Sequence, residues 1–217
     1  MQIFALVTQK GGSGKSTIAS SLAIAAHEAG ERVFVIDMDP QASLVKWFKV
    51  RGNKDVAVES VMPAKLAPAL KALEKAGVTC VIIDTPGTES SAAEAAMKAA
   101  DLCIIPARPN AFDLWASEAT RKTLRSLKRE YVFLLNQCPP AQQSARVEEG
   151  AKALEAMGGL ITPMIASRVD YQEAARQGLG VTELHASGPA ADEMRKLWKS
   201  IKRRMSKGSS KPAKKAA

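Results

Sequence analysis

The sequence predicts an α/β fold in which a mostly parallel, twisted sheet carries helices on both faces. Short runs rich in Val, Ile and Leu alternate with longer segments of helical periodicity, an order typical of consecutive βαβ units. A glycine-rich stretch stands between the first apolar run and the first helical segment. The chain has 217 residues, enough for one domain with a full core. We therefore expect a single domain over residues 1–206.

The glycine-rich stretch joins a predicted strand at residues 3–7 to a predicted helix at residues 18–29. Closely spaced glycines let backbone N–H groups turn inward around an anion, and the following helix points its positive dipole end at the same place. This predicts a phosphate-binding P-loop, and hence a P-loop NTPase fold. Lys15 would contact the outer phosphates, and the Ser16 hydroxyl would ligate magnesium. The nucleotide-binding residues predicted here are Lys10, Gly11, Gly12, Ser13, Gly14, Lys15, Ser16 and Thr17.

The next elements are bounded by turn residues. Gly30 is a typical helix stop, and it precedes a β-branched strand at residues 32–37. Asp39 and Pro40 interrupt the pattern before the next helix. Pro68 lies near the start of a helical segment, where a proline is tolerated or kinks the helix. These segments predict helices at 42–49 and 63–76, with a short strand within 54–61.

The second half of the chain repeats the alternation. Residues 78–84 form the most continuous apolar run, which indicates the central strand, and a Thr-Pro-Gly turn ends it. A loop is expected at residues 106–113. The remaining predicted strands are 102–105, 131–135 and 160–165, and the remaining predicted helices are 89–99, 114–128, 142–157, 172–177 and 190–205.

The formal charge of +9 is concentrated at the C-terminus. Ten of the 31 basic residues and no acidic residue lie in residues 194–217, so the rest of the chain has 21 basic against 22 acidic residues. Residues 207–217 contain only Lys, Ser, Gly, Pro and Ala, which predicts a disordered basic tail. Such a block fits a polyanionic partner, either nucleic acid or an anionic membrane surface.

Several classes of protein are disfavoured by what the sequence lacks. No apolar run approaches the roughly 18 residues of a membrane span, and Met1 leads straight into the first strand without a secretory signal. We therefore expect a cytoplasmic protein. Cys80, Cys103 and Cys138 lie in or after apolar runs without metal-type spacing, so they are expected to be buried thiols.

Three carboxylates follow predicted strands whose carboxyl ends meet at the ligand-binding edge of such a sheet. Asp84 ends the central strand and has the form of a Walker B acid that holds magnesium, directly or through water, opposite Ser16. Asp37 and Asp39 end the second strand and are expected to reach the nucleotide and its metal. For Asp39, an ordinary Asx-Pro turn is the alternative.

The loop departs from the common P-loop pattern, because Gln9 stands at its first glycine and Lys10 adds a second lysine. This K-G-G-x-G-K-S/T form resembles the deviant Walker A loop of the ParA/MinD family of ATPases. The resemblance implies ATP and Mg²⁺ as cofactors and a sandwich homodimer in which Lys10 reaches the partner subunit's ATP. The segment from Asp37 to Gln41 is similar to the family's D-x-D-P-Q switch, which implies that Asp39 places the attacking water. The catalytic residues implied are Lys10, Lys15 and Asp39.

The resemblance, which covers residues 1–205, also implies secondary sites. Pro106 and Asn136 follow strands where family members contact the adenine, and no guanine-reading N-K-x-D motif occurs. Arg168 belongs to a segment similar to one that faces the dimer and DNA surfaces. No helix-turn-helix precedes the first strand, so the chain is like the short ParA proteins, and operator binding is not expected.

The last predicted helix has an apolar stripe and an otherwise basic surface. It would either lie on an anionic bilayer, as in the MinD branch, or dock its stripe on the sheet and turn its basic residues to DNA. We favour DNA because a hydrophilic tail follows the helix, whereas MinD-type membrane helices sit at the extreme end of the chain. No base-reading motif is visible, so binding to DNA phosphates is expected to be independent of sequence. The predicted DNA-binding residues are Arg168, Arg195, Lys196, Lys199, Lys202, Arg203 and Arg204.

The sequence therefore predicts a nucleoid-associated, ParA-type ATPase that segregates or positions a cargo, with hydrolysis stimulated by a ParB-like or analogous adaptor. A membrane-associated positioning ATPase like MinD is the alternative. An iron–sulfur carrier sharing the loop would need a cysteine pair bridging the dimer, which three scattered cysteines do not offer. A DNA-coating protein that binds ATP without turnover is a third possibility. The sequence does not identify the cargo.

Overall fold

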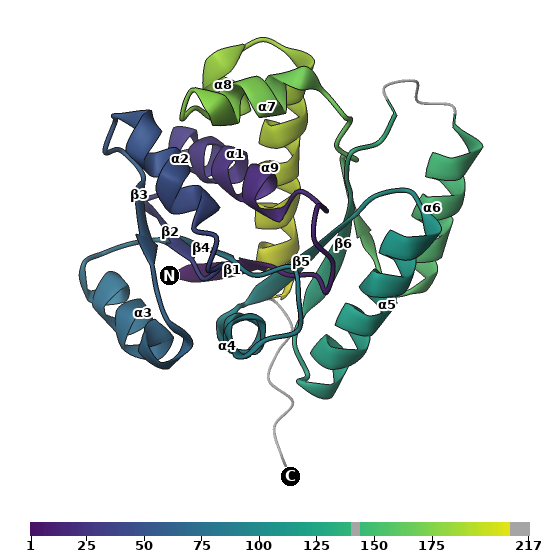
Figure 1. The fold of residues 1–217 in the computed structure, drawn as a ribbon, viewed down its shortest axis with the longest axis horizontal. Coiled ribbons are helices and arrows are strands. Elements are labelled where there is room, and N and C mark those ends of the chain that lie inside the picture. The colour runs from purple at the N-terminus through teal and green to yellow at the C-terminus, as the bar shows by residue number, and fades with distance from the viewer. Residues whose placement is uncertain (140–143, 209–217) are drawn as a thin grey trace.

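The computed structural model describes residues 1–139 and 144–208, with residues 207 and 208 described by their backbone only. Within these ranges, seven strands form one sheet in the order β3-β2-β4-β1-β5-β6-β7, and every neighbouring pair is parallel (Figure 1). The predicted fold class is confirmed. The strands are β1 Gln2–Leu6, β2 Val33–Asp37, β3 Ala57–Ser60, β4 Cys80–Asp84, β5 Leu102–Ala107, β6 Tyr131–Leu135 and β7 Leu160–Ile161.

Helices cover both faces of the sheet (Figure 1). One layer contains α1 Lys15–Glu28, α2 Ser43–Arg51, α7 Val169–Arg176, α8 Val181–Leu184 and α9 Pro189–Gly208. The other layer contains α3 Leu66–Lys75, α4 Ser91–Ala99, α5 Ala111–Ser126 and α6 Ala145–Ala156, with a 3₁₀ turn at Pro63–Lys65 before α3. Because both faces are covered, the central strands are apolar at successive positions. In β4, Cys80 and Ile82 face the first layer, while Val81 and Ile83 face the second.

The structure corrects several predicted boundaries. Helix α5 begins three residues earlier than predicted because the Asn110 side chain caps it, accepting the Asp113 N–H at 3.0 Å. Strand β7 ends at Ile161, since Pro163 has no N–H to continue the ladder. Pro106, expected in a loop, lies inside β5. The four-residue helix α8 was not predicted.

Two predictions, the start of one helix and the disordered tail, fall wholly or partly outside the described residues. The predicted helix start at residue 142 lies outside them, and α6 is described from Ala145. Helix α9 continues to Gly208, two residues into the segment predicted as a disordered tail. Residues 209–217 lie outside the described residues, so the rest of that tail remains a prediction.

The apolar stripe of helix α9 is buried in the core of the protein. Met194, Leu197 and Ile201 are fully buried, and Trp198 contacts Phe4 of β1 edge to face with ring centroids 5.9 Å apart. The stripe that could have met a bilayer therefore belongs to the core beside α1. No helix in the described ranges is long and apolar enough to cross a membrane.

Candidate nucleotide site

The glycine-rich loop joins β1 to α1 at the carboxyl edge of the sheet. Gly12 and Gly14 have φ of 76° and 90°, a region that favours glycine. The end of β6 holds this loop, since Asn136 Nδ2 donates to Ser13 O at 2.8 Å and Gln137 Nε2 donates to Gly12 O at 3.2 Å. A Cβ at Gly14 would lie 2.4 Å from Asn136 Nδ2, so this contact also requires glycine. The loop predicted to bind phosphate is thus positioned by its neighbours.

Ser16 and Asp84, predicted to lie opposite each other, are brought together by the structure. Ser16 Oγ donates to Asp84 Oδ2 at 2.6 Å. Asp84 is fully buried, and burial raises the pKa of its carboxyl to about 7, against the lowering effect of the Ser16 hydrogen bond. Among the described residues, nothing hydrogen-bonds the buried Asp84 Oδ1 or the buried Ser13 Oγ.

These oxygens fit a magnesium ion that is held mainly by nucleotide and water. Mg²⁺ prefers hard oxygen ligands and usually takes one or two carboxylates together with phosphates and waters. Asp84 Oδ1 supplies an oxygen without a partner within the described residues, and the Ser16 hydroxyl lies next to it. No group of three or more His, Cys, Asp and Glu that could hold a metal exists in the described ranges.

Asp37 lies beside Asp84 in the paired register of β2 and β4, but its oxygens already have donors. Oδ2 accepts the N–H groups of Leu44 and Val45 at 2.9 and 3.2 Å, and Oδ1 accepts that of Asp39 at 3.1 Å. Burial raises the pKa of Asp37 despite these bonds. Asp37 therefore fixes the start of α2 and the turn before it. Its predicted contact with magnesium stays a prediction.

The charge of Asp39 acts on the buried Lys15 of the P-loop. Lys15 is buried, and its Nζ lies 3.4 Å from the carbonyl of Lys10. Burial lowers the pKa of Lys15, while the charges of Asp84 and Asp39 raise it in part. Asp39 Oδ1 accepts the Gln41 N–H at 2.9 Å, which is the Asx turn weighed from the sequence, and the residue remains half-exposed. The turn occupies one Asp39 oxygen, and the role of Asp39 in placing the attacking water stays a prediction.

Lys10 points away from Lys15 toward the start of α5. Its Nζ lies 2.8 Å from Asp113 Oδ2 and 5.4 Å from the centre of the Phe112 ring. Asp113 is buried and also accepts from Arg108, at 3.1 Å on Oδ1 and 3.2 Å on Oδ2. Burial raises the pKa of Asp113, but the bonds from Arg108 and Lys10 outweigh it and lower the pKa below its ordinary value. Asp113 was not identified from the sequence.

Gly87 makes a second contact that the sequence did not reveal. A Cβ at this position would lie 2.8 Å from Gly11 Cα and 2.9 Å from Gly11 N. The neighbouring Thr85 hydroxyl donates to Leu6 O at 2.7 Å. The segment after Asp84 therefore lies directly against the start of the P-loop. Because the two backbones are in contact, a movement of one segment would displace the other. The only sequence signal was the Thr-Pro-Gly turn itself.

The two residues predicted to contact the adenine base, Pro106 and Asn136, are both buried and contact other parts of the protein. Pro106 is buried in β5 opposite Leu134 of β6. Asn136 is buried, and its side-chain amide donates a hydrogen bond to Ser13 O of the P-loop. A contact of either residue with adenine stays a prediction.

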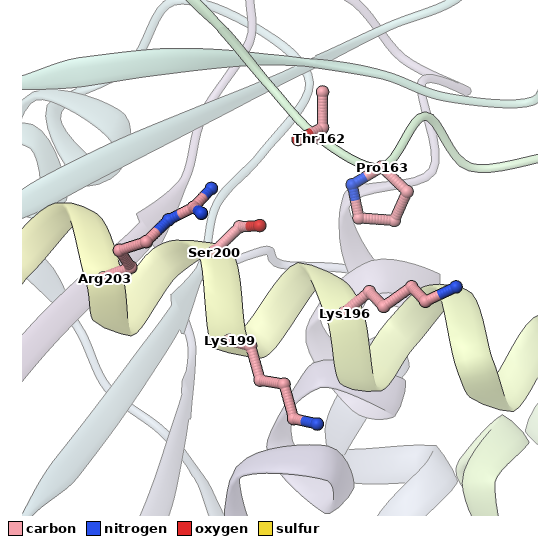
Figure 2. A pocket seen from close by; sticks show the side chains of 6 residues that line it. All are labelled: Thr162, Pro163, Lys196, Lys199, Ser200 and Arg203. Carbon is pink, nitrogen blue, oxygen red and sulfur yellow. The ribbon is translucent and has the colours of Figure 1, made fainter.

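Most of the basic residues predicted to bind DNA have acidic partners. Ion pairs join Arg168 to Glu193 at 2.7 Å, Arg195 to Glu28 at 3.0 Å, Lys196 to Asp192 at 2.6 Å, Lys202 to Glu31 at 2.8 Å and Arg204 to Glu130 at 3.6 Å. Lys199 and Arg203 have no ion pair within the described residues. Together with Lys196 and Ser200 of α9 and the facing Thr162 and Pro163, they line a pocket of about 330 Å³ (Figure 2).

The three cysteines are buried and unbridged, as predicted. Burial raises the pKa of the Cys80 and Cys103 thiols to about 12 and that of Cys138 to about 11. Buried, protonated thiols are poor metal ligands. They do not provide the surface cysteine pair that a cluster shared between two subunits would need.

The chain is similar to known nucleotide-binding proteins. A family model described as the CobQ/CobB/MinD/ParA nucleotide binding domain matches residues 4–182. The maintenance of carboxysome distribution protein A of Halothiobacillus neapolitanus is 31% identical over 205 residues, covering 89% of this chain and 93% of that protein. The protein of the same name from Gloeobacter kilaueensis is 33% identical over 194 residues, covering 84% of each chain.

Solved structures share the fold. Apo McdA from Cyanothece has a TM-score of 0.79 at 19% identity and covers 94% of this chain and 99% of its own. The septum site-determining protein MinD of Pyrococcus horikoshii, solved with Mg-ADP, has a TM-score of 0.73 at 18% identity, covering 94% and 97%. The family model and the two relatives that are more than 30% identical show that the chain belongs to the CobQ/CobB/MinD/ParA family of nucleotide-binding ATPases.

Proposed function

We propose that this chain is a ParA-type ATPase whose ATP-bound sandwich dimer binds DNA without sequence specificity and positions a cargo by partner-stimulated hydrolysis. One observation carries the proposal. Lys10 belongs to the P-loop, yet its ammonium forms an ion pair with Asp113 and not with Asp84, the acid expected to hold magnesium. A second lysine that does not serve its own phosphate cradle is available to a second subunit.

The same residues support a mechanism of hydrolysis. The P-loop amides and Lys15 would hold the β- and γ-phosphates, and Ser16 and Asp84 would hold Mg²⁺, which neutralises charge developing on the phosphate oxygens. Asp39 would orient a water molecule toward the γ-phosphorus. A bond forms between that water oxygen and phosphorus, the bond to the β,γ-bridging oxygen breaks, and ADP and inorganic phosphate result. Lys10 of the partner subunit would stabilise the same charge.

The cargo proposal rests on the relatives. Two proteins more than 30% identical over most of their length are named for the maintenance of carboxysome distribution. We therefore propose that this chain positions a protein assembly, and that an adaptor connects the two and stimulates hydrolysis. The chain would work in the cytoplasm on the nucleoid surface.

For the DNA-binding surface, the structure favours a smaller set than the sequence predicted. Exposed cations without acidic partners cost least to place on phosphates, which points to Lys199 and Arg203, with Lys196 beside them. The burial of the α9 stripe supports DNA over a membrane, because bilayer binding through that stripe would require α9 to leave the core.

The test is a gel shift with non-specific double-stranded DNA in the presence of ATP, ADP or no nucleotide, each with magnesium. Binding with ATP alone that weakens steeply between 50 and 200 mM salt is the expected result, about 10³-fold if some six phosphates are contacted. The Asp39→Ala protein should stay on DNA after ATP addition and release no phosphate. DNA binding that is indifferent to nucleotide would overturn the proposal, and normal hydrolysis by Asp39→Ala would overturn the role of Asp39.

A further inference from the structure

An exposed aromatic pair lies at the start of α5, directly beside Lys10. Phe112 and Trp115 are 68% and 67% exposed, and their rings meet edge to face with centroids 5.4 Å apart. Residues three apart share one helix face, so α5 presents both rings together. They are the most exposed aromatic side chains in the described part of the chain. A cluster of two large apolar side chains in solvent is typical of a binding surface.

The position of the pair indicates its partner. Lys10 Nζ lies 5.4 Å from the Phe112 ring and 2.8 Å from Asp113, the next residue. In the proposed sandwich dimer Lys10 crosses to the other subunit, so atoms in contact with Lys10 lie at or beside the interface. The aromatic pair is therefore continuous with that interface.

We infer that Phe112 and Trp115 form an apolar contact with a second copy of this chain in the ATP-bound dimer. This inference rests on the proposed dimerisation. A two-fold interface uses the same patch on both subunits, so two aromatic pairs, one from each subunit, would be buried per dimer. Aromatic side chains bury large areas with little loss of side-chain freedom, which suits a contact that forms and breaks with each ATP turnover.

Other partners fit this surface less well. Lys10 and Arg108 both form ion pairs with Asp113, whose single charge offsets only one of these two cations. The patch is therefore poor at attracting a basic adaptor segment. DNA phosphates would meet the unpaired cations of α9, which lies in the opposite helical layer (Figure 1).

The experiment compares dimerisation of the unchanged protein, Phe112→Ala and Val50→Ala by sedimentation velocity with magnesium and slowly hydrolysed ATPγS. Val50 is an exposed apolar residue near the end of α2 and serves as the control. Phe112→Ala should weaken the dimer about 10- to 30-fold, as truncation of an interface aromatic commonly does, while Val50→Ala should not. Binding of a fluorescent ATP analogue at low protein concentration should be the same in all three.

Tryptophan fluorescence gives an independent test in the unchanged protein. Trp47 and Trp198 are about 95% buried, so acrylamide quenching reports mainly on Trp115. Quenching should fall when ATPγS drives dimerisation and should stay high with ADP. Unaltered quenching in a demonstrated dimer, or full dimerisation by Phe112→Ala, would overturn the inference. Protection of Trp115 that appears only on adding an adaptor would also overturn it. If the unchanged protein forms no dimer with any nucleotide, the proposed function fails instead.

Discussion

At the scale of single residues, the two lysines of the P-loop have different surroundings and should give different variants. Lys15 is buried among Asp84, Asp39 and the loop carbonyls, whereas Lys10 is paired with Asp113. Lys15→Ala should weaken ATP binding about 10- to 100-fold, since it removes charge-assisted contacts to phosphate. Lys10→Ala should bind ATP within about threefold of normal as a monomer but form no dimer, if each lysine contact acts at a separate site. Equilibrium titration with a fluorescent ATP analogue, followed by sedimentation, measures both. Equal loss of ATP binding in the two variants would contradict the distinction.

Gly87 gives a second prediction at this scale. A methyl group there would lie 2.8 Å from the backbone of Gly11, which cannot rotate away as a side chain could. Gly87→Ala should shift the P-loop and weaken ATP binding about tenfold, with a stability loss of about 1 to 3 kcal/mol, as for other overpacked sites. Gly150→Ala in α6 is the control, because its Cβ meets ordinary contacts at 3.5 Å. ATP titration and denaturant unfolding check both. ATP binding by Gly87→Ala equal to that of the control would count against the close approach.

The sequence identified these site residues by type but not all of their contacts. Ser16 and Asp84 could be paired in advance because each follows a recognisable strand in a parallel sheet. The role of Asp37 as a cap could not, since its donors belong to a helix seven and eight residues later. The Lys10–Asp113 pair joins the P-loop to the first turn of α5, about a hundred residues later, and no local pattern signals it.

At the scale of elements, Arg51 joins α2 to the segment around α8. Its guanidinium donates to Glu183 and Asp55 at 2.7 to 2.9 Å and to Gly178 O at 3.0 Å, with a side chain only 1% exposed. Arg51→Met should cost about 3 kcal/mol of unfolding free energy, the low end for breaking a buried ion pair. Arg176→Met, which removes a largely exposed pair with Glu173, should cost much less unfolding free energy than Arg51→Met. Urea unfolding of both variants at pH 7 measures the difference, and equal costs would refute it.

The stability provided by the Arg51–Asp55 ion pair should depend on pH. The hydrogen bonds from Arg51 lower the pKa of Asp55 in the folded protein, so the stability they provide is full above the unfolded pKa near 4 and is lost as pH falls through the folded value. The gap in unfolding free energy between the unchanged protein and Arg51→Met should therefore be constant above about pH 5 and shrink below about pH 4. Urea titrations at pH 7 and pH 3 test this. A gap at pH 3 as large as at pH 7 would exclude the linkage.

Most elements could be predicted from the sequence because apolar strands and amphipathic helices alternate regularly. The exceptions are short. Helix α8, which was not predicted, has four residues, less than two turns of periodicity, and β7, which was predicted to run to residue 165, has two. Elements of this length are fixed by their contacts with the rest of the fold and not by their own pattern.

At the scale of the whole molecule, the position of charge predicts how DNA binding responds to substitution. Lys199→Glu with Arg203→Glu reverses two cations that have no acidic partner in the described chain. Lys71→Glu with Lys75→Glu makes the same change of net charge on α3, in the other helical layer. In the ATP-bound state the first variant should bind DNA weakly, with the slope of log affinity against log salt reduced by about 2. Fluorescence anisotropy across a salt series measures the slopes. Equal slopes for the two variants would show that only net charge matters.

The excess of positive charge could be read from the sequence, but not which cations remain available. Arg195, Lys202 and Arg204 face acidic residues of α1, of the turn after α1 and of the segment before β6. These partners come together only when α9 docks. A count of charges along the helix therefore overestimates the surface that DNA can use.

The shared carboxylate of Asp113 has one more consequence, for how readily Lys10 can leave. A buried carboxylate that loses its only cation is left with an uncompensated charge, at a cost of several kcal/mol. Asp113 avoids this, because Arg108 donates to both of its oxygens. If Lys10 moves to the partner subunit as proposed, Arg108 keeps the carboxylate paired. In the proposed cycle, Lys10 would therefore leave Asp113 at little cost in free energy and return after each round without refolding of the nucleotide site.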